Sequence, residues 1–418
     1  MKYFQNYKGL KNMDNDKFLP DYTGKEIPNR CVLPWMSLET SPLGGFRPCC
    51  LYDRELLDVN VKTHSLEEVF RGQEMQDLRY AFSKNKKPGS CQRCFKEEDA
   101  GKKSKREYML EKFKDYDAKV DYQNLDGENI VFLDLKLGNI CNLKCRICGP
   151  WSSSKWAQEE AAHGGKDHIA NDWLKQGRWP RSSKQFWEHL DELLPNIQYF
   201  EFTGGEPFLI KQHFDLLQRA VDQGYAGNID IHYNTNGTQF PKQREVWKHF
   251  KNVQIAFSID NVGDKFEYER DGAKWTTVNS NINKFVELKT QGYPLEFQVC
   301  TTWNVQNTMY MSELLSWFKK TGIPDIHFNL MHDPEQFSLF NLPLSLKTPT
   351  MISLDKCIVM HPDFEERIRS IKFIVTQRSD ENDGNALRRK LNEVDTIRDK
   401  HLSNSHVKLA QLLNYEQA

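Results

Sequence analysis

Three cysteines in one short segment form the pattern in this sequence best suited to chemistry. They are Cys141, Cys145 and Cys148, in the run Cys-Asn-Leu-Lys-Cys-Arg-Ile-Cys. Three thiolates on one loop can each bind one iron of a [4Fe–4S] cluster. The segment supplies no fourth ligand, so one iron would keep an open position, as zinc does in catalytic sites with three protein ligands. The spacing favours an open cluster over the two alternatives, a zinc site and a set of reduced structural cysteines.

Three further polar motifs each follow directly after a stretch that we expect to form a β-strand. They are Gly204-Gly205-Glu206-Pro207, Asn236-Gly237 and Ser258-Ile259-Asp260. A Gly-Gly pair lets the backbone approach a ligand closely, and polar groups at strand ends can bind a ribose or a carboxylate. Arg270 follows these motifs and can clamp a carboxylate with two hydrogen bonds. Each motif alone is also ordinary turn or capping chemistry, so the indication comes from their combination.

The elements that must position these residues alternate regularly. Strands are expected at 130–137, 197–203, 228–234, 253–260, 295–302 and 325–331. Helices are expected at 151–163, 183–194, 211–223, 241–250, 278–291 and 308–320, with an insertion at 164–182. Repeats of strand and helix imply a parallel sheet, and six units are fewer than the eight of a closed barrel. The expected fold is therefore α/β, an open partial (β/α)6 barrel whose strand ends bring the motifs to one edge.

The order of these motifs resembles the radical SAM superfamily over roughly residues 128–331. The resemblance implies that the cluster on the three cysteines binds S-adenosylmethionine (SAM) at its open iron. An electron from the reduced cluster would then cleave SAM to methionine and a 5′-deoxyadenosyl radical, which abstracts a hydrogen from the substrate. It also implies that Gly204, Gly205 and Glu206, in one motif with Pro207, hold the methionine amino group. Asn236, Ser258 and Asp260 would lie near the ribose and carboxylate, and Arg270 near the carboxylate.

A second group of cysteines precedes this region. It comprises Cys31, Cys49, Cys50, Cys91 and Cys94, which supply at least four thiolate ligands. Spacing alone fits either a fully ligated [4Fe–4S] cluster or a zinc site. The stretch resembles the Twitch/SPASM auxiliary-cluster modules of radical SAM enzymes, although those modules usually follow the barrel. The resemblance implies one auxiliary cluster, with Cys49 favoured over Cys50 because Gly45-x3-Cys49 matches the module's pattern.

We expect four regions along the chain. Residues 1–30 are an N-terminal extension, 31–125 the auxiliary-cluster module, 126–335 the radical SAM barrel and 336–418 a helical tail. The module is expected to contain a helix at 65–83, opened by a Ser65 cap with Glu68, and a charged run at 96–116 forming a solvated helix or linker. The tail is expected to start with a Pro-rich connector, followed by helices near 363–378 and 385–401.

Several residues stand outside these motifs. Cys300, in the fifth strand, is expected to be a buried apolar thiol, with hydrogen donation to a radical as the alternative. Cys357 stands alone. His332-Asp333 follows the sixth strand, where a role in substrate binding is the alternative to an ordinary surface position, and His327 lies within that strand. The tryptophans are expected to pack between helices.

Charge and hydropathy narrow the class of partner. The 418 residues include 57 Lys and Arg against 58 Asp and Glu, a balance that disfavours non-specific nucleic-acid binding. No stretch reaches the ~18 apolar residues of a membrane span, and the N-terminus has no apolar signal core, so a cytoplasmic protein is expected. The resemblance implies a peptide or protein substrate and an external electron donor such as flavodoxin or ferredoxin. The alternatives are a small metabolite or RNA base as substrate, and a zinc-stabilised interaction protein without catalysis.

Overall fold

The computed structural model describes residues 27–99, 103–377 and 382–415. They form two compact units, one built mainly from residues 27–131 and the other from residues 132–415 together with the short segments 40–45 and 60–63. The expected N-terminal extension, residues 1–30, lies almost entirely outside the described residues. No helix in the described ranges is both long enough and apolar enough to cross a lipid bilayer.

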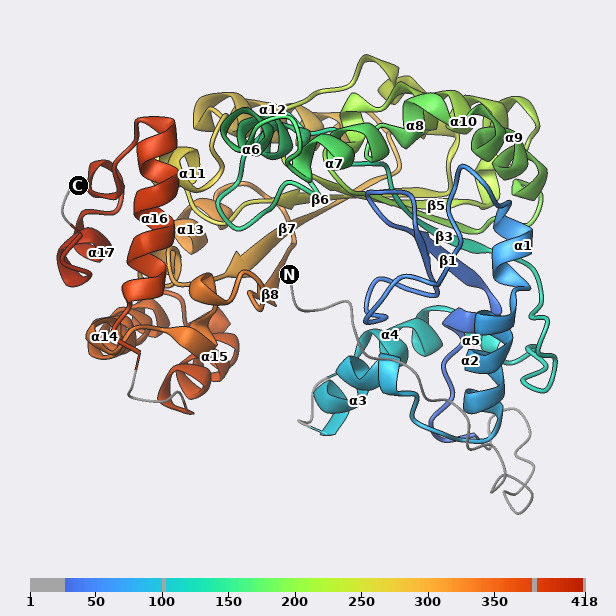
Figure 1. Cartoon of the computed structure of the whole chain (residues 1–418), viewed down its shortest axis with the longest axis horizontal. Helices are drawn as coiled ribbons and strands as arrows, with labels where there is room; N and C mark the ends of the chain where they lie inside the picture. Colours follow the sequence, from blue (N-terminus) through green and yellow to red (C-terminus); the bar gives the residue numbers. More distant parts are fainter. Residues whose placement is uncertain (1–26, 100–102, 378–381, 416–418) are drawn as a thin grey trace. The chain divides into compact units, whose positions relative to one another are not determined.

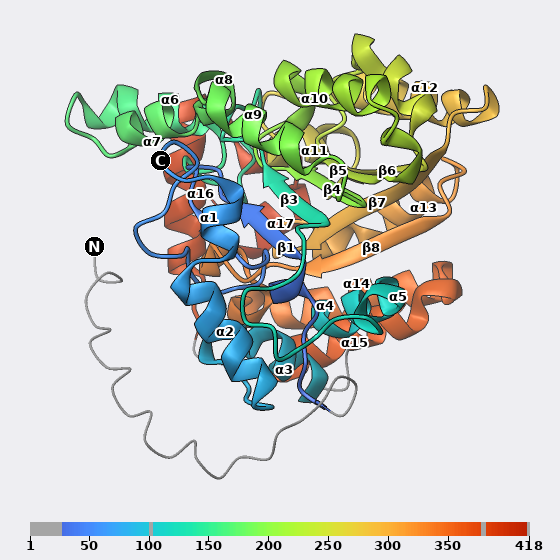
Figure 2. The same cartoon turned by 90° about the vertical axis from the view of Figure 1, so that its right-hand side faces the viewer.

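Six parallel strands form the frame of the second unit (Figures 1 and 2). They are β3 (Phe132–Lys136), β4 (Tyr199–Thr203), β5 (Asp230–Thr235), β6 (Asn252–Ser258), β7 (Leu295–Trp303) and β8 (Asp325–Leu330). Each strand pairs in parallel with the next one along the chain. All six strands predicted from the sequence are present, and β8 ends the order. The predicted fold class, an open α/β barrel of six strands, is confirmed.

The two faces of this sheet differ in chemistry. Along β5 and β7, buried residues alternate strictly with partly exposed ones. The buried positions of β5 to β7 are mostly apolar and lie under the helices. The alternate positions form rows of polar residues across neighbouring strands, such as Ser258, Cys300 and His327, which are register partners. Because a sheet buried on both faces shows continuous apolar runs instead, this alternation marks one face as a polar surface.

Helices between the strands cover the apolar face; Figures 1 and 2 show α10 and α12 there. The helices are α6 (Ser154–Gly164), α7 (Ala170–Gln176), α8 (Trp179–Ser182), α9 (Lys184–Leu193), α10 (Lys211–Asp222), α11 (Gly263–Glu269), α12 (Trp275–Thr290) and α13 (Met311–Phe318). Aromatic rings make the core beneath them, with Phe208 packing against Tyr233, Trp247 and Phe285. The predicted helix at 241–250 is instead the 3₁₀-helix η7 (Lys242–His249), and the insertion contains α7 and α8.

The tail after β8 is helical, as expected, but it begins earlier than expected. Its helices are α14 (Leu344–Met360), α15 (Glu365–Gln377), α16 (Asn385–Arg398) and α17 (Val407–Leu412). The expected Pro-rich connector is therefore mostly helix. Pro343 sits at the N-cap of α14, where a missing N–H costs nothing, and only Pro349 lies inside the helix.

The first unit is made of short elements. They are η3 (Leu33–Trp35), β1 (Ser37–Thr40), β2 (Phe46–Arg47), α1 (Leu66–Phe70), α2 (Gln73–Ser83), η4 (Gly89–Cys91), α3 (Gln92–Asp99), α4 (Lys105–Lys112) and α5 (Lys114–Asp117). The predicted capping box of Ser65 and Glu68 is confirmed, but the predicted helix at 65–83 is two helices, because Gly72 caps a second start. Arg79 joins the unit's segments by donating to the carbonyls of Pro34, Phe70 and Leu125 at 2.7–2.8 Å.

Candidate active site

The loop between β3 and α6 carries the three cysteines of the Cys-x3-Cys-x2-Cys motif. The insertion holds its start: the Asn139 backbone N–H donates to the Gly177 carbonyl at 3.1 Å, and the Asn139 Nδ2 donates to the Trp173 carbonyl at 3.1 Å. Helix α6 holds its middle, because the Ser153 hydroxyl at the N-cap donates to the Leu143 carbonyl at 2.6 Å. The loop is therefore fixed by neighbouring elements at more than one point.

The thiols of Cys141, Cys145 and Cys148 influence one another's charge. Burial raises the pKa of all three, and it brings that of Cys145 to about 12. The guanidinium of Arg270 opposes this rise of the pKa at Cys145 and Cys148. Such thiols release their protons readily only when a metal supplies positive charge. Three sulfur donors on one loop are the ligand chemistry that an iron–sulfur cluster requires, so these residues fit that group.

The Gly204-Gly205 turn after β4 lies directly against the cysteine loop. The Gly205 N–H donates to the Gly138 carbonyl at 3.0 Å, and the Glu206 N–H donates to the Ile140 carbonyl at 2.8 Å. A Cβ at Gly205 would lie 2.3 Å from the Ile140 carbonyl oxygen. Gly204 has a positive φ of +105°, which disfavours any other residue. The glycines thus bring two strand ends together. From the sequence they were expected instead to let a ligand approach the backbone closely.

The Glu206 carboxylate ties β4 to β5. It is 1% exposed and accepts from the Thr235 hydroxyl at 2.8 Å, the Asn236 N–H at 2.8 Å and the Phe208 N–H at 3.2 Å. Burial raises its pKa to about 7, although these hydrogen bonds oppose the rise. Pro207 begins the short 3₁₀-helix that follows. The side chain of Glu206 therefore supports the neighbouring turn rather than standing free for a ligand.

Asn236 links the end of β5 to the cysteine loop. Its Nδ2 donates to the Asn142 Oδ1 at 3.1 Å, and the Asn142 Nδ2 donates to the Thr238 hydroxyl at 2.9 Å. The Asn236 Nδ2 also lies 3.9 Å from the Cys141 sulfur. Asn142 and Thr238 were not singled out from the sequence. The position of Asn142 directly after Cys141 was the available signal.

Asp260 and Arg270, which the sequence assigned to separate parts of a ligand, form a buried ion pair with each other. The Arg270 Nη2 lies 2.7 Å from the Asp260 Oδ2, and the Asp260 Oδ1 accepts from the Thr302 N–H at 2.9 Å. Burial opposes the charge of Arg270, but Asp260 and Cys145 outweigh it and raise the arginine's pKa. The Arg270 Nε is buried without a hydrogen-bond partner. This donor is one that a bound carboxylate could satisfy.

One row on the polar face contains Ser258, Cys300 and His327. Cys300 is half-buried, and its sulfur accepts from the Asn329 Nδ2 at 3.1 Å. The expectation of a buried apolar thiol at Cys300 is therefore wrong, because the alternation along β7 turns this residue to the polar face. Cys357 is buried in α14, and the His332 ring stacks on Phe340.

Cys31, Cys49, Cys91 and Cys94 gather in the first unit. Every pair among Cys31, Cys49, Cys91 and Cys94 interacts electrostatically, and burial is the largest cause of a raised pKa at each of them. That of Cys49 rises to about 11. The Cys50 sulfur instead accepts from the Lys105 Nζ at 2.9 Å. The four thiols fit a fully ligated cluster.

Two family models match the chain. The model for the radical SAM superfamily matches residues 135–331, and the model for SPASM, an iron–sulfur cluster-binding domain, matches residues 31–95. Residues 135–331 are thus a radical SAM domain, and residues 31–95 are a SPASM auxiliary-cluster module. A radical SAM domain implies a [4Fe–4S] cluster and SAM, and a SPASM domain implies an auxiliary cluster.

Two curated relatives share weak sequence similarity. One is a GTP 3′,8-cyclase of Syntrophomonas wolfei, 28% identical over 194 residues, which cover 44% of this chain and 52% of the relative. The other is a GTP 3′,8-cyclase of Vibrio atlanticus, 23% identical, covering 50% and 57%. The chain thus spans about half the length of the curated relatives it matches.

Among solved structures, one similar chain is anSMEcpe with bound AdoMet and a Cp18Cys peptide. It is 15% identical with a TM-score of 0.38, covering 57% of this chain and 62% of that one. Another is Streptococcus suis SuiB bound to the precursor peptide SuiA, 15% identical with a TM-score of 0.35, covering 65% and 60%.

Proposed function

We propose that this enzyme holds its SAM-binding cluster on Cys141, Cys145 and Cys148 and uses it to abstract a hydrogen from a peptide or protein substrate. The observation that carries the proposal is the meeting of this loop with the ends of β4, β5 and β6. Gly205, Asn236 and Arg270 all lie against the loop or its thiols. When bound, the reduced cluster supplies the electron that cleaves SAM to methionine and a 5′-deoxyadenosyl radical.

The chain's own residues would bind and orient the cofactor. We propose that backbone carbonyls of the Gly204-Gly205 turn, which lies beside the cysteine loop, accept from the methionine amino group. Arg270, held by Asp260, presents its unpartnered Nε to a carboxylate. Ser258 and Asn236 offer hydroxyl and amide groups for a ribose. Packing of the turn against the loop also excludes water from this side of the site.

The four thiols of Cys31, Cys49, Cys91 and Cys94 are proposed as ligands of the auxiliary cluster. Four protein ligands would leave no open iron, so this cluster would transfer electrons or anchor a substrate through its surroundings rather than bind SAM. All ten cysteines are free thiols. Free thiols suit a reducing compartment, and we propose a cytoplasmic enzyme with an external electron donor such as flavodoxin or ferredoxin.

The polar face of the barrel supports a peptide as the substrate. From β5 to β8 its positions carry amides, hydroxyls, imidazoles and carboxylates. They are Asp230, His232, Asn234, Asn252, Gln254, Ser258, Glu296, Gln298, Thr302, Asp325, His327 and Asn329. Amide and hydroxyl groups pair with the backbone N–H and C=O groups of an extended chain. A triphosphate would instead be bound by arginines and lysines.

A nucleotide remains the second candidate because both curated relatives are named as GTP 3′,8-cyclases. The two candidates differ in charge. The carboxylates of Glu296 and Asp325 on the polar face would repel a triphosphate, whereas a peptide carrying lysine or arginine would be attracted to them.

The test compares the two substrate classes on the anaerobically reconstituted enzyme. With dithionite and SAM present, 5′-deoxyadenosine is quantified after addition of GTP or of synthetic peptides encoded beside the gene. The proposal expects a peptide to raise 5′-deoxyadenosine formation and to change in mass, with GTP leaving both unaffected. Consumption of GTP with no response to any peptide would replace the peptide proposal with the nucleotide one.

A further inference from the structure

We propose that the C-terminal helix α16 holds the cysteine loop in position and that Arg398 is the main positioning residue. This inference rests on the proposed function, because it concerns the cluster that the loop would hold. Arg398 lies more than 240 residues after the loop in sequence. Its side chain is nevertheless only 1% exposed and lies against the loop. Nothing in the radical SAM motif itself calls for this residue.

Arg398 binds the segment between the first two cysteines. Its Nη1 donates to the Lys144 carbonyl at 2.7 Å, and its Nη2 lies 2.8 Å from the Glu159 carboxylate on α6. Its Nε lies 3.4 Å from Asp271. The Lys144 N–H in turn donates to the Asp271 carbonyl at 2.8 Å. One guanidinium therefore joins the cysteine loop, α6 and the segment that carries Arg270.

A second link from α16 reaches the residue between the last two cysteines. The Arg146 guanidinium pairs with Asp395, and both side chains are buried. Asp395 also accepts from the Tyr268 hydroxyl at 3.1 Å and the Tyr415 hydroxyl at 2.7 Å. The Arg146 Nε donates to the Tyr268 carbonyl at 3.0 Å. Both basic residues of the motif are thus held by α16, one turn of helix apart.

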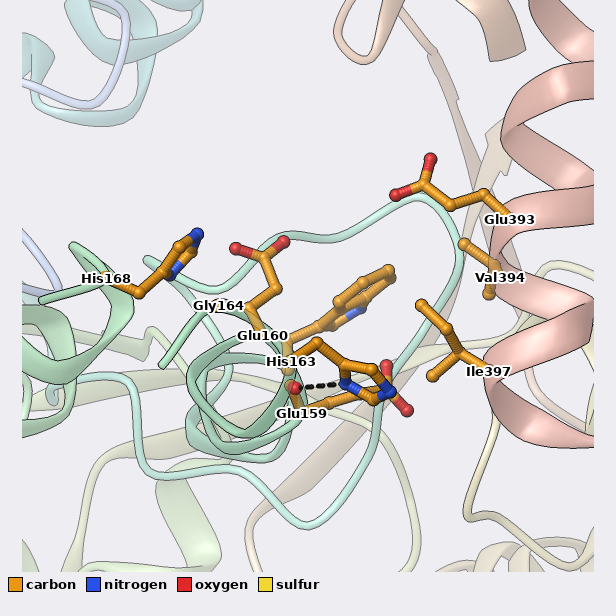
Figure 3. A pocket seen from close by; sticks show the side chains of 9 residues that line it. Glu159, Glu160, His163, Gly164, His168, Glu393, Val394 and Ile397 are labelled. Atoms are coloured by element: carbon orange, nitrogen blue, oxygen red, sulfur yellow. Dashed lines mark hydrogen bonds between the residues drawn. The ribbon is translucent and has the colours of Figure 1, made fainter. Parts of the chain in front are cut away.

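The contacts of Arg398 extend to a ligand residue through Trp156. The Arg398 guanidinium lies over the Trp156 ring at 4.2 Å, and the Trp156 Nε1 donates to the Cys145 carbonyl at 2.7 Å. Figure 3 shows α6 and α16 facing each other across a pocket, with Glu159 and Ile397 on its two sides. Because residues behind a metal's ligands fix the ligands' orientation, loss of Arg398 should loosen the cluster even though Arg398 touches no sulfur.

The experiment compares Arg398→Met with Arg389→Met, an exposed arginine on the same helix that serves as control. The reduced, reconstituted enzyme is challenged with an iron chelator. The readout is the decay of the electron paramagnetic resonance signal that SAM addition perturbs, because that signal belongs to the cluster with an open iron. The Arg398→Met variant should lose the signal about tenfold faster than the native enzyme. The Arg389→Met variant should match the native enzyme.

A conservative variant distinguishes a loss of loop positioning from a failure of the protein to fold. Arg398→Lys keeps the charge near Glu159 but cannot also reach the Lys144 carbonyl, so its signal should decay at an intermediate rate. If Arg398→Met does not fold, the Lys variant decides the question. Native decay rates in the Arg398 variants, in an enzyme that shows the SAM-sensitive signal, would overturn this inference alone. Absence of that signal from the native enzyme would overturn the proposed function as well.

Discussion

At Gly205, one missing Cβ decides how closely two strand ends approach. The turn's N–H groups reach carbonyls at the start of the cysteine loop, and the Ile140 carbonyl occupies the space that a side chain would need. The sequence identified the glycine pair but assigned it to the close approach of a ligand, whereas the close approach is to another backbone segment. It could not identify the partner, because the loop that comes close lies more than sixty residues earlier in the chain.

Gly205→Ala should separate the turn from the cysteine loop. Relief of a contact of 2.3 Å with backbone requires movement, and overpacking of this kind costs about 1–3 kcal/mol of stability. We expect the iron bound by the reconstituted variant to fall by about half, as the open cluster is lost. The matched control is Gly227→Ala, where an added Cβ would meet no atom within 4 Å. Full iron content in Gly205→Ala would contradict this account of the turn.

The buried carboxyl of Glu206 should make the stability of the fold depend on pH. Its pKa lies near 7 in the fold and at the ordinary value of 4.5 in the unfolded chain, so between these pH values the folded chain binds the extra proton. The stability that this proton adds is therefore greatest at low pH and is lost as pH rises toward 7, at about 1 kcal/mol per pH unit.

Glu206→Gln removes this dependence. The glutamine keeps one acceptor but turns an NH2 group toward a backbone N–H, so it should destabilise the fold by about 1–3 kcal/mol at pH 5.5. The difference from the native chain should shrink by pH 8. Urea unfolding at the two pH values measures it. A difference that stays constant between the two pH values would show that Glu206 is ionised throughout.

At the scale of elements, the edge strand β8 depends on the tail. The Arg367 Nη1 on α15 donates to the Ile326 carbonyl at 2.6 Å, and its guanidinium lies 5.7 Å from the centre of the Phe328 ring. An exposed strand edge presents unpaired backbone groups to other chains, so covering it protects the sheet. The sequence predicted both the strand and a helix near 363–378, but not their contact.

Arg367→Met should loosen β8 without unfolding the barrel. Hydrogen–deuterium exchange in residues 325–330 should speed up, because a carbonyl at the edge loses its charged donor. Arg369→Met is the control, since Arg369 pairs with Glu365 on the exposed face of the same helix. Equal exchange in the two variants would show that α15 does not protect the strand.

At the scale of the whole molecule, we propose that seven of the cysteines are divided between two cluster sites. The strand pattern and the tight cysteine spacings predicted the fold and the two kinds of cluster-binding domain, because these signals are local. The sequence could not distinguish the spatial positions of the adjacent residues Cys49 and Cys50. In the fold the Cys49 thiol interacts with the other three thiols, and the Cys50 sulfur accepts from Lys105. Arg398 is distant in sequence, with no local pattern to mark it.

This division predicts separate losses of iron. Cys49→Ala should remove about four of about eight irons, and Cys50→Ala should leave the count unchanged. Iron and sulfide analysis after anaerobic reconstitution measures both. Loss of iron in Cys50→Ala with a full count in Cys49→Ala would exchange the two assignments.

In the proposed mechanism, the three-cysteine loop holds the cluster that cleaves SAM. The most direct measurement is 5′-deoxyadenosine formed by the reduced, reconstituted enzyme, compared with Cys141→Ala and with Cys357→Ala as a control within α14. We expect 5′-deoxyadenosine from the native enzyme and the control, and none from Cys141→Ala. Undiminished 5′-deoxyadenosine from Cys141→Ala, or none from the native enzyme, would contradict it.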